Sequence, residues 1–312
     1  MFLKKVKNFI IINSYLFYFL INVGSKIFIT YFNIIHWSIR HGFNIFHKPL
    51  LHLKGKTIYI LGTGESVTEY KSYQWNKIKN GYSIGLNMWI LHDFVPDILQ
   101  LELVSEDKNY LDNVIKILEK RQLEYLETKI FFKSNYLTSN SFFKVHDFFQ
   151  RIPKSLKQNI YLIADFPIPG NNIDYFEKSL KYLSFFNFFN HKIKFHLMTA
   201  QARASLGLSI IFSIQTGFEH ISLCGVDLYN TRHFYDLDDY YFNKYNLNSI
   251  KYTSNVRCHQ TNDKDYFELT ISDTIISLYN NICKNRNIKI SVGSMRSKLY
   301  PIFPFTFIDI EN

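Results

Sequence analysis

The sequence places polar, potentially reactive side chains directly after an apolar strand, His220–Cys224. The residues of interest beyond this strand are Gly225, Asp227, Tyr229, Tyr235 and His259. Open α/β sheets build their ligand sites where strands end. Tyrosine hydroxyls can hold a leaving phosphate, and a histidine can take a proton near neutral pH. The combination predicts transfer of a group from a nucleotide donor.

A glycine-rich turn follows the expected strand Thr57–Leu61 and reads Gly62-Thr63-Gly64-Glu65-Ser66. A strand, such a turn and a polar residue that opens a helix form a phosphate-binding arrangement, because free backbone N–H groups and the helix dipole face the turn. Val67 departs from the dinucleotide-binding pattern, and the turn lacks the lysine of a P-loop. A ligand loop and a plain tight turn both remain open.

Strands and helices are expected to alternate after residue 55. The expected strands are 57–61, 82–86, 98–103, 128–132, 220–224 and 289–291, and the expected helices reach residue 80 and cover 111–126, 200–216 and 267–284. This alternation predicts an α/β fold with a mainly parallel, Rossmann-like sheet and helices on both faces. The Phe-rich segment 134–190 is expected to form a small lid subdomain, and 230–262 is a second candidate for a lid or acceptor region.

The first fifty residues are apolar, aromatic and basic. Two apolar runs, Phe9–Val23 and Ile27–Trp37, have Lys and Arg residues on their flanks. Each run is shorter than the ~20 residues of a spanning helix, and the sequence lacks a signal-peptide cleavage site there. We therefore expect N-terminal membrane-associating helices in residues 1–50 and a globular domain in 55–312. A helical hairpin packed on that domain is the alternative.

Composition narrows the class of partner. The chain has 312 residues, is 47% hydrophobic and carries a net charge of +10, so it is globular and attracts anions. Its lysines are scattered and no nucleic-acid-binding motif occurs, which favours an anionic lipid surface and an anionic substrate over nucleic acid. The cysteines are Cys224, Cys258 and Cys283. This sparse set supports neither a disulfide framework nor a zinc site and fits a reducing compartment.

These motifs resemble the bacterial sialyltransferases of Campylobacter and Haemophilus lipooligosaccharide synthesis, patchily over residues 56–300. Gly225–Tyr229 is similar to that family's Gly-Ile-Asp-Phe-Tyr, and Tyr235 keeps the six-residue spacing to a second tyrosine. His259 opens a segment similar to the family's His-Ser-Lys-Asn-Thr-Asp. The ungapped run 205–235 is the most specific part of the resemblance.

The donor side of the resemblance rests on shorter matches. The turn at residues 62–67 resembles the family's Gly-Asn-Gly-Pro-Ser-Leu nucleotide loop, with Thr63 at the place of the Asn. Asn87 resembles the second donor-contacting Asn of the family, and the third falls near Glu102. Ser205 retains the Ser of a Thr-Ser-Gly motif, and Arg203 lies about one position from the family's Arg.

The resemblance implies a GT-A-like variant fold and an inverting, metal-independent transfer of sialic acid or a related nonulosonic acid from a CMP-sugar to a hydroxyl of a surface glycan. His259 would be the general base, and Tyr229 and Tyr235 would donate hydrogen bonds to the departing CMP phosphate. The residues implied to bind the donor are Gly62, Thr63, Gly64, Ser66, Asn87, Arg203, Ser205, Gly225 and Asp227.

Partners follow from the same resemblance. It implies a CMP-sugar donor, a glycan or glycolipid acceptor, no further cofactor and no metal, and it leaves room for a homo-oligomer. Together with the basic N-terminus, it implies a peripheral enzyme on the cytoplasmic face of the bacterial inner membrane, attached to its anionic surface.

Other interpretations stay open at the sequence level. A CMP-Kdo transferase fits the departures on the donor side. The acidic run Asp236-Leu237-Asp238-Asp239 imitates a DxD metal motif, so a metal-dependent nucleotide-diphosphate-sugar transferase or a related pyrophosphokinase is a second hypothesis. A non-catalytic, membrane-bound nucleotide-binding protein is the third. The purely structural interpretations are that Tyr229 and Tyr235 are packing residues whose hydroxyls reach water and that Asp227 caps a turn.

Overall fold

A computed structural model describes residues 2–45, 56–102, 108–133, 142–190, 198–229, 232–237, 239–247 and 260–307. Within these residues, nine strands form one sheet in which every pair is parallel. The strands are β1 (Asn44–Ile45), β2 (Thr57–Leu61), β3 (Tyr82–Leu86), β4 (Ile98–Leu101), β5 (Lys129–Lys133), β6 (Ile160–Pro167), β7 (Met198–Gln201), β8 (His220–Cys224) and β9 (Lys289–Val292). The predicted α/β fold with a parallel sheet is confirmed.

The order of the strands defines a switch point between β2 and β8. The sheet runs β1-β6-β5-β4-β3-β2-β8-β9, with β7 beside β6. From β2 the chain builds strands outward in one direction as far as β6, and β8 and β9 are added on the other side of β2. Leu61 and Cys224 are partners in the register, so β2 and β8 end side by side. In open parallel sheets, ligands bind beyond the carboxyl ends of strands at such a point.

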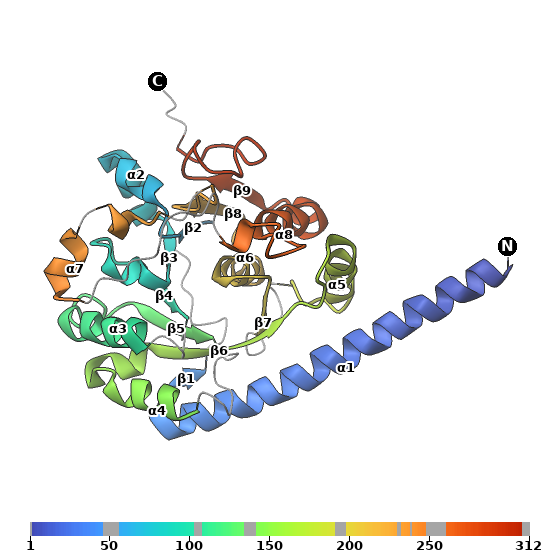
Figure 1. Cartoon of the computed structure of the whole chain (residues 1–312), viewed down its shortest axis with the longest axis horizontal. Helices are drawn as coiled ribbons and strands as arrows, with labels where there is room; N and C mark the ends of the chain where they lie inside the picture. Colours follow the sequence, from blue (N-terminus) through green and yellow to red (C-terminus); the bar gives the residue numbers. More distant parts are fainter. Residues whose placement is uncertain are drawn as a thin grey trace.

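Helices cover both faces of the sheet, as predicted (Figure 1). Two buried clusters of apolar side chains, one on each face, form the core. One face is covered by α2 (Ser72–Asn80), α3 (Lys108–Lys120), α4 (Phe142–Arg151) and the short α7 (Tyr240–Tyr245), and the other by α5 (Ile173–Phe185), α6 (Ser205–Thr216) and α8 (Ile271–Leu278). Because the central strands are buried on both faces, they read as continuous apolar runs in the sequence.

The segment expected to form a lid is built into the sheet instead. Its described part, residues 142–190, contains α4, β6 and α5. Strand β6 pairs with β1, β5 and β7, so it lies inside the sheet. The expectation of a separate lid at 142–190 was therefore wrong. Its turn residues mark the ends of β6 and the start of α5 rather than a subdomain boundary.

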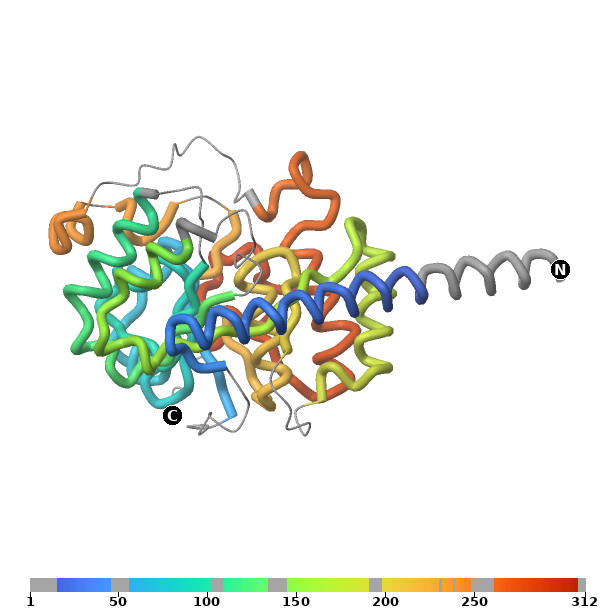
Figure 2. The backbone as a smooth tube through the Cα atoms, turned by 90° about the horizontal axis from the view of Figure 1, so that it is seen from below, coloured from blue at the N-terminus to red at the C-terminus, as the bar shows by residue number. Residues whose placement is uncertain are grey.

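The N-terminus forms one helix, α1 (Phe2–His41), where two were expected. Gly24 and the polar residues around it do not interrupt the helix, since an isolated glycine costs a helix only ~1 kcal/mol. The helix crosses the body of the protein along β6 (Figures 1 and 2). Strand β1 follows it and pairs with β6, so the N-terminal segment is joined to the domain.

Helix α1 has a buried face and an apolar exposed face. Phe19, Val23, Ile34 and Trp37 are at most 7% exposed and belong to the core. Large apolar side chains on the other face are exposed: Phe17, Tyr18, Leu20, Ile21, Phe28, Ile29, Phe32, Ile35 and Ile39. The stretch Leu16–His41 is long and apolar enough to cross a membrane, which is weak evidence for an anchor. Its contact with β6 shows that this helix lies along the domain.

Candidate functional site

The loops after β2 and β8 interlock at the switch point. The Gly62 N–H donates to the Cys224 carbonyl at 2.7 Å, and the Gly64 N–H donates to the Gly225 carbonyl at 2.8 Å. Gly225 has a φ of +64°, and a Cβ atom there would lie 2.2 Å from the Gly62 carbonyl oxygen. Only glycine permits both the left-handed backbone and this close approach.

In this packing, backbone N–H groups that the turn was expected to offer to a ligand form hydrogen bonds within the protein. The amides of Gly62 and Gly64 bond to the β8 side, and the Ser66 N–H donates to Asp227 Oδ2 at 3.0 Å. The expectation that free N–H groups face a ligand is therefore wrong for these three residues. Gly62, Gly64 and Gly225 pack the two loops against each other, and they also line the pocket described below.

Asp227 and Ser66 bind each other across this junction. The Ser66 hydroxyl donates to Asp227 Oδ1 at 2.5 Å, in addition to the amide bond. Burial raises the pKa of the Asp227 carboxyl above its usual value, and the two hydrogen bonds from Ser66 oppose that rise. Asp227 thus holds the loop after β2 in place, and it is also one of the residues that line a pocket.

That pocket opens beyond the carboxyl ends of β2, β3, β4 and β8 and encloses about 210 Å³. Seven of the predicted donor-binding residues line it: Gly62, Thr63, Gly64, Asn87, Ser205, Gly225 and Asp227. Its other lining residues are Leu86, Glu102, Ala204, Leu206, Val226, Leu228, Arg232, His233, Thr261 and Ile271. The predicted residues Ser66, Arg203, Tyr229 and Tyr235 are not among them, and His259 lies outside the described residues.

A buried ion pair underlies the pocket floor. The Lys133 ammonium is fully buried and donates to Glu102 Oε1, while the Ser205 hydroxyl donates to Glu102 Oε2 at 2.8 Å. Asn87, with a φ of +51°, accepts the Glu102 N–H at its side-chain oxygen at 3.1 Å. The Asn87 side-chain amide also donates to Glu102 Oε2 at 3.4 Å, so Asn87, directly after β3, and Ser205, at the start of α6, are held by the same carboxylate. The uncapped N-terminus of α6 lies beside it at Ala204.

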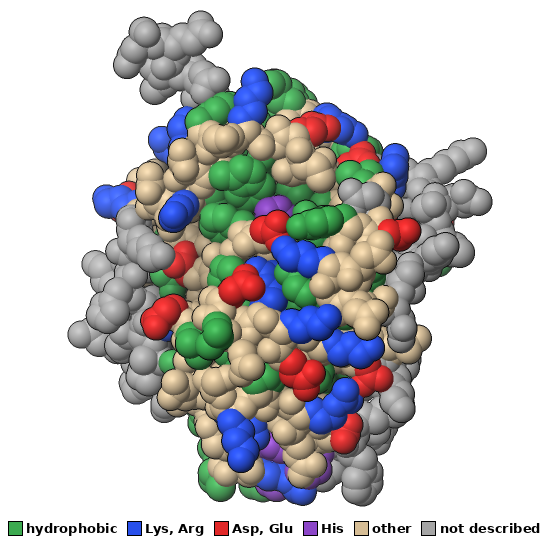
Figure 3. Space-filling model, turned by 90° about the vertical axis from the view of Figure 1, so that its left-hand side faces the viewer, with side chains coloured by type: hydrophobic (Ala, Val, Ile, Leu, Met, Phe, Trp, Pro, Cys, Tyr) green, Lys and Arg blue, Asp and Glu red, His purple; other side chains and the backbone are tan. Residues whose placement is uncertain are grey.

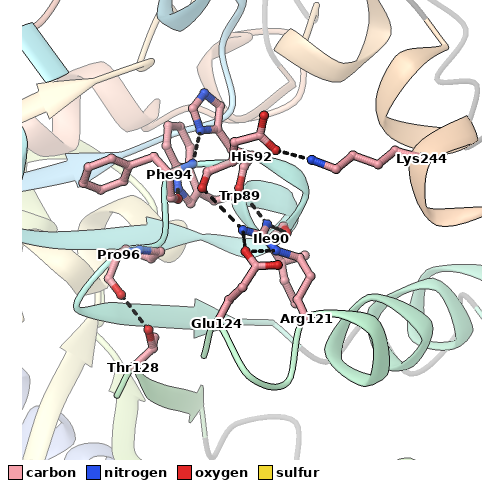
Figure 4. A network of polar contacts seen from close by, with 10 residues as sticks. Trp89, Ile90, His92, Phe94, Pro96, Arg121, Glu124, Thr128 and Lys244 are labelled. Atoms are coloured by element: carbon pink, nitrogen blue, oxygen red, sulfur yellow. Dashed lines mark hydrogen bonds and ion pairs between the residues drawn. The ribbon is translucent and has the colours of Figure 1, made fainter. Parts of the chain in front are cut away.

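Helix α3 fixes the turn that carries Asn87. Arg121 is 1% exposed and donates to the carbonyls of Ile90 and His92 at 2.6 and 2.7 Å, and to Glu124 at 2.6 Å (Figure 4). These carbonyls belong to or directly follow the 3-10 turn Asn87–Leu91. The buried guanidinium thus ties the backbone after β3 to α3.

Arg203 points away from the pocket. Its Nη2 donates to the Asn171 carbonyl at 2.9 Å, and its guanidinium lies over the Phe267 ring, 5.8 Å from the centroid. Its φ of +67° marks the sharp turn between β7 and α6. In this arrangement the side chain anchors the β6–α5 loop.

Tyr229 lies in a charged cluster behind the loop after β2. Its hydroxyl donates to Glu65 Oε1 at 3.0 Å, and the Arg296 guanidinium lies 5.5 Å from its ring centroid. Glu65 also accepts from Arg296 at 2.7 Å and lies 3.5 Å from Arg232. Burial, followed by the hydrogen bond to Glu65, raises the pKa of the Tyr229 phenol to about 12. The phenol is therefore fully protonated near neutral pH.

Tyr235 is held among rings beside the pocket. It is 3% exposed, stacks on His233 with centroids 4.9 Å apart, and meets Phe234 and Phe242 edge-on. His233 Nδ1 lies 2.8 Å from the Thr63 hydroxyl, and burial lowers the pKa of this imidazole to about 4. His233 thus presents a neutral ring to the pocket at pH 7.

Sequence reasoning missed three residues of this region: Arg232, His233 and Lys133. Arg232 and His233 lie between the two predicted tyrosines, and their position there was the available signal. Lys133 gave no usable signal, because a lysine at the end of a strand is ordinarily a solvated residue.

The acidic run shows no metal-binding arrangement in its described part. Asp236 Oδ2 accepts the His233 N–H at 2.9 Å and so caps its own turn, while Asp238 lies outside the described residues. Across the described residues, no group of three His, Cys, Asp or Glu side chains is placed to hold a metal ion. On the face seen in Figure 3, Lys and Arg side chains are interspersed with Asp and Glu rather than gathered in a stripe.

Comparisons with known proteins give a fold likeness. Neither a protein-family model nor a curated protein matches the sequence. The structure is similar to the crystal structure of the monofunctional alpha-2,3-sialyltransferase Cst-I from Campylobacter jejuni, with 15% sequence identity, a TM-score of 0.44 and 80% of each chain covered. At this identity and TM-score we base no residue role on the likeness, and the function is argued from the site.

Proposed function

We propose that this protein is an inverting, metal-independent glycosyltransferase. It moves sialic acid or a related nonulosonic acid from a CMP-sugar to a hydroxyl of a bacterial surface glycan. The observation that carries the proposal is the pocket at the switch point between β2 and β8, which seven predicted donor-binding residues line. Those residues come from four separate parts of the chain, so their convergence supports the sequence motifs as parts of one site.

The pocket suits a nucleotide for chemical reasons. Glu102, Asn87 and Ser205 offer hydrogen-bonding groups at its floor, and Arg232 lies on its wall. Apolar side chains such as Leu206 and Ile271 complete it. Ligand pockets combine apolar walls with a few placed polar groups in this way.

In the proposed reaction, His259 is the general base that takes the proton of the acceptor hydroxyl. Tyr229 and Tyr235 are the candidate hydrogen-bond donors to the departing CMP phosphate, and the Tyr229 hydroxyl must first leave Glu65 to act in this way. The protonated state of the Tyr229 phenol suits that role. We expect the enzyme to lie on the anionic cytoplasmic surface of the inner membrane, near a glycolipid acceptor, and the exposed apolar face of α1 supports this expectation.

A ligand panel followed by a turnover assay tests this function. Thermal stabilisation is measured with CMP, UDP and GDP, and CMP release is then measured from CMP-sialic acid and CMP-Kdo, with and without EDTA. We expect CMP to stabilise the protein best, CMP-sialic acid to turn over in EDTA, and His259→Ala to slow release about 10²–10⁴-fold. Loss of activity in EDTA favours the metal-dependent alternative. Stabilisation by CMP without any turnover favours a non-catalytic protein.

A further inference from the structure

The proposed reaction makes its phosphate group more negative. In a CMP-sugar the phosphate is a diester with one negative charge. When the bond between the sugar and the phosphate oxygen breaks, the electron pair stays on that oxygen, and CMP leaves as a monoester with close to two negative charges at pH 7. The acceptor oxygen forms the new bond to the sugar, and its proton passes to the base. A site without a metal must therefore supply positive charge or hydrogen-bond donors at the phosphate.

Both tyrosines expected at the phosphate are engaged elsewhere. A phenol has one proton, and that of Tyr229 is donated to Glu65. Tyr229 therefore cannot donate to a phosphate while this bond holds. Tyr235 is buried in ring contacts, and neither tyrosine lines the pocket.

Arg232 does line the pocket, in the segment between the two tyrosines. Among the described lining residues it is the one with a permanent positive charge, since burial keeps the His233 imidazole neutral at pH 7. The nearby Lys133 lies behind the wall and is paired with Glu102. The charge of Arg232 thus reaches the cavity directly.

The contact between Arg232 and Glu65 is easily exchanged. Arg232 Nε lies 3.5 Å from Glu65 Oε2, and the arginine side chain is 56% exposed. An ion pair of this exposure contributes little stability. Glu65 keeps Arg296 at 2.7 Å and the Tyr229 hydroxyl at 3.0 Å when Arg232 turns to another anion. Rotation of Arg232 toward a phosphate therefore leaves the Glu65 carboxylate paired.

The backbone beside Arg232 is fixed against the loop after β2. The Phe234 N–H donates to the Thr63 carbonyl at 2.9 Å, and His233 forms an antiparallel bridge with Gly64. The bond between the Thr63 hydroxyl and the His233 ring adds a third link. Arg232 is therefore held at the rim of the pocket by its neighbours.

We infer that Arg232 binds the phosphate of the departing nucleotide and neutralises the charge that develops on it. This inference rests on the proposed function and adds a residue to it. A guanidinium can hold two phosphate oxygens at once, and such charge-assisted bonds are about twice as strong as neutral ones. The nucleoside part of the donor contacts other residues, so the effect of Arg232 is confined to the phosphate.

Binding of CMP and of cytidine, measured by calorimetry, separates these contributions. For Arg232→Ala we expect the Kd of CMP to rise about 10–100-fold, as for loss of a hydrogen bond to a charged group. The Kd of cytidine should stay within about twofold, because cytidine has no phosphate. Arg232→Lys should give an intermediate value, since lysine keeps the charge but not the two-pronged geometry. Arg151→Ala, which removes a similarly exposed arginine from α4, is the matched control.

The outcomes are distinct. Equal losses of CMP and cytidine affinity in Arg232→Ala would mean that the side chain only shapes the pocket, and the inference fails. Unchanged CMP affinity in that variant also overturns it, while the proposed function survives. If the wild-type protein binds neither CMP nor cytidine, the proposed function fails first and the inference fails with it.

Discussion

At the scale of single residues, the pocket floor depends on one buried ion pair. Lys133 is fully buried and Glu102 is 19% exposed, so each charge depends on the other. Buried ion pairs add little net stability, yet removal of one partner is costly because the remaining charge is uncompensated. A pair of this kind at the end of β4 and β5 is best explained by the orientation it gives to the Glu102 carboxylate, which also holds Ser205 and Asn87.

We predict a large coupling energy between Lys133 and Glu102. Lys133→Met and Glu102→Gln should each lower the free energy of unfolding by about 3–5 kcal/mol, and the double variant should recover most of that loss. Urea unfolding of the four proteins measures the cycle. The exposed pair Lys56–Glu219, with an N–O distance of 2.7 Å, is the control and should couple by less than about 1 kcal/mol. Strictly additive losses at the buried pair would contradict the prediction.

The residues that sequence reasoning found and missed differ in the range of their contacts. The sequence identified Gly62 and Gly225 as the residues that directly follow two predicted strands. Their contact with each other could not be predicted, because the two residues lie far apart in the chain. The hydrogen bonds from Ser66 to Asp227 and from Tyr229 to Glu65 could not be predicted for the same reason, since each joins residues far apart in the sequence. A motif gives the residue types of a site, while the direction of each side chain depends on partners from other elements.

At the scale of elements, strands β2, β3, β4, β5, β8 and β9 were predictable, and β1, β6 and β7 at one side of the sheet were not. Strands β2, β3 and β8 are short apolar runs bounded by turn residues, the pattern of a strand buried on both faces. The last two residues of β7, Ala200 and Gln201, were assigned to a helix, because the small and apolar residues of 200–216 fit a helical pattern. The pairing of β7 with β6 is a tertiary contact that overrides this local pattern.

The 3-10 turn Asn87–Leu91 should depend on Arg121, the residue directly after α3. Arg121→Lys keeps the charge, but a lysine cannot donate hydrogen bonds to the carbonyls of Ile90 and His92 and to the Glu124 carboxylate at the same time. We expect a loss of about 2–4 kcal/mol in the free energy of unfolding, together with weaker CMP binding, because the turn carries Asn87 into the pocket. Urea unfolding and CMP calorimetry measure the two effects. Arg151→Lys on the exposed surface should change neither.

The two faces of α1 should respond differently to substitution. Phe28 and Phe32 are 74% and 69% exposed, so Phe28→Glu with Phe32→Glu should leave the melting temperature nearly unchanged. The same double variant should bind anionic lipid vesicles at least about tenfold more weakly, because it removes apolar area and adds negative charge. Trp37→Ala on the buried face should instead cost about 3–5 kcal/mol of stability.

Vesicle sedimentation measures this binding, with vesicles of neutral lipid as the control for the charge contribution. Unchanged binding of the Phe28/Phe32 variant would exclude this face of α1 as the lipid contact. The exposed apolar stripe would then need another partner, such as a second copy of the chain.

At the scale of the whole molecule, histidines buried in a neutral state should make the fold sensitive to acid. Burial lowers the pKa of His41, His92 and His233 to about 4, below the ordinary value of 6.5. These residues lie at three separate places: the end of α1, the turn after β3 and the pocket. The unfolded chain takes up protons at these histidines at a higher pH than the folded protein does. Stability is therefore complete above pH 6.5 and falls as the pH drops toward 4.

For His92 and His233 the loss should be on the order of 1–3 kcal/mol each over that range. Carboxylates also contribute to acid unfolding, so a variant must isolate one histidine. His92 Nδ1 accepts the Phe94 N–H at 2.9 Å, and His92→Asn keeps an acceptor there without a titrating ring. Urea unfolding between pH 7 and 4 should give a shallower loss of stability for this variant than for the wild type, whatever its stability at pH 7. Equal slopes would mean that the folded protein accepts a proton at His92 as readily as the unfolded chain does.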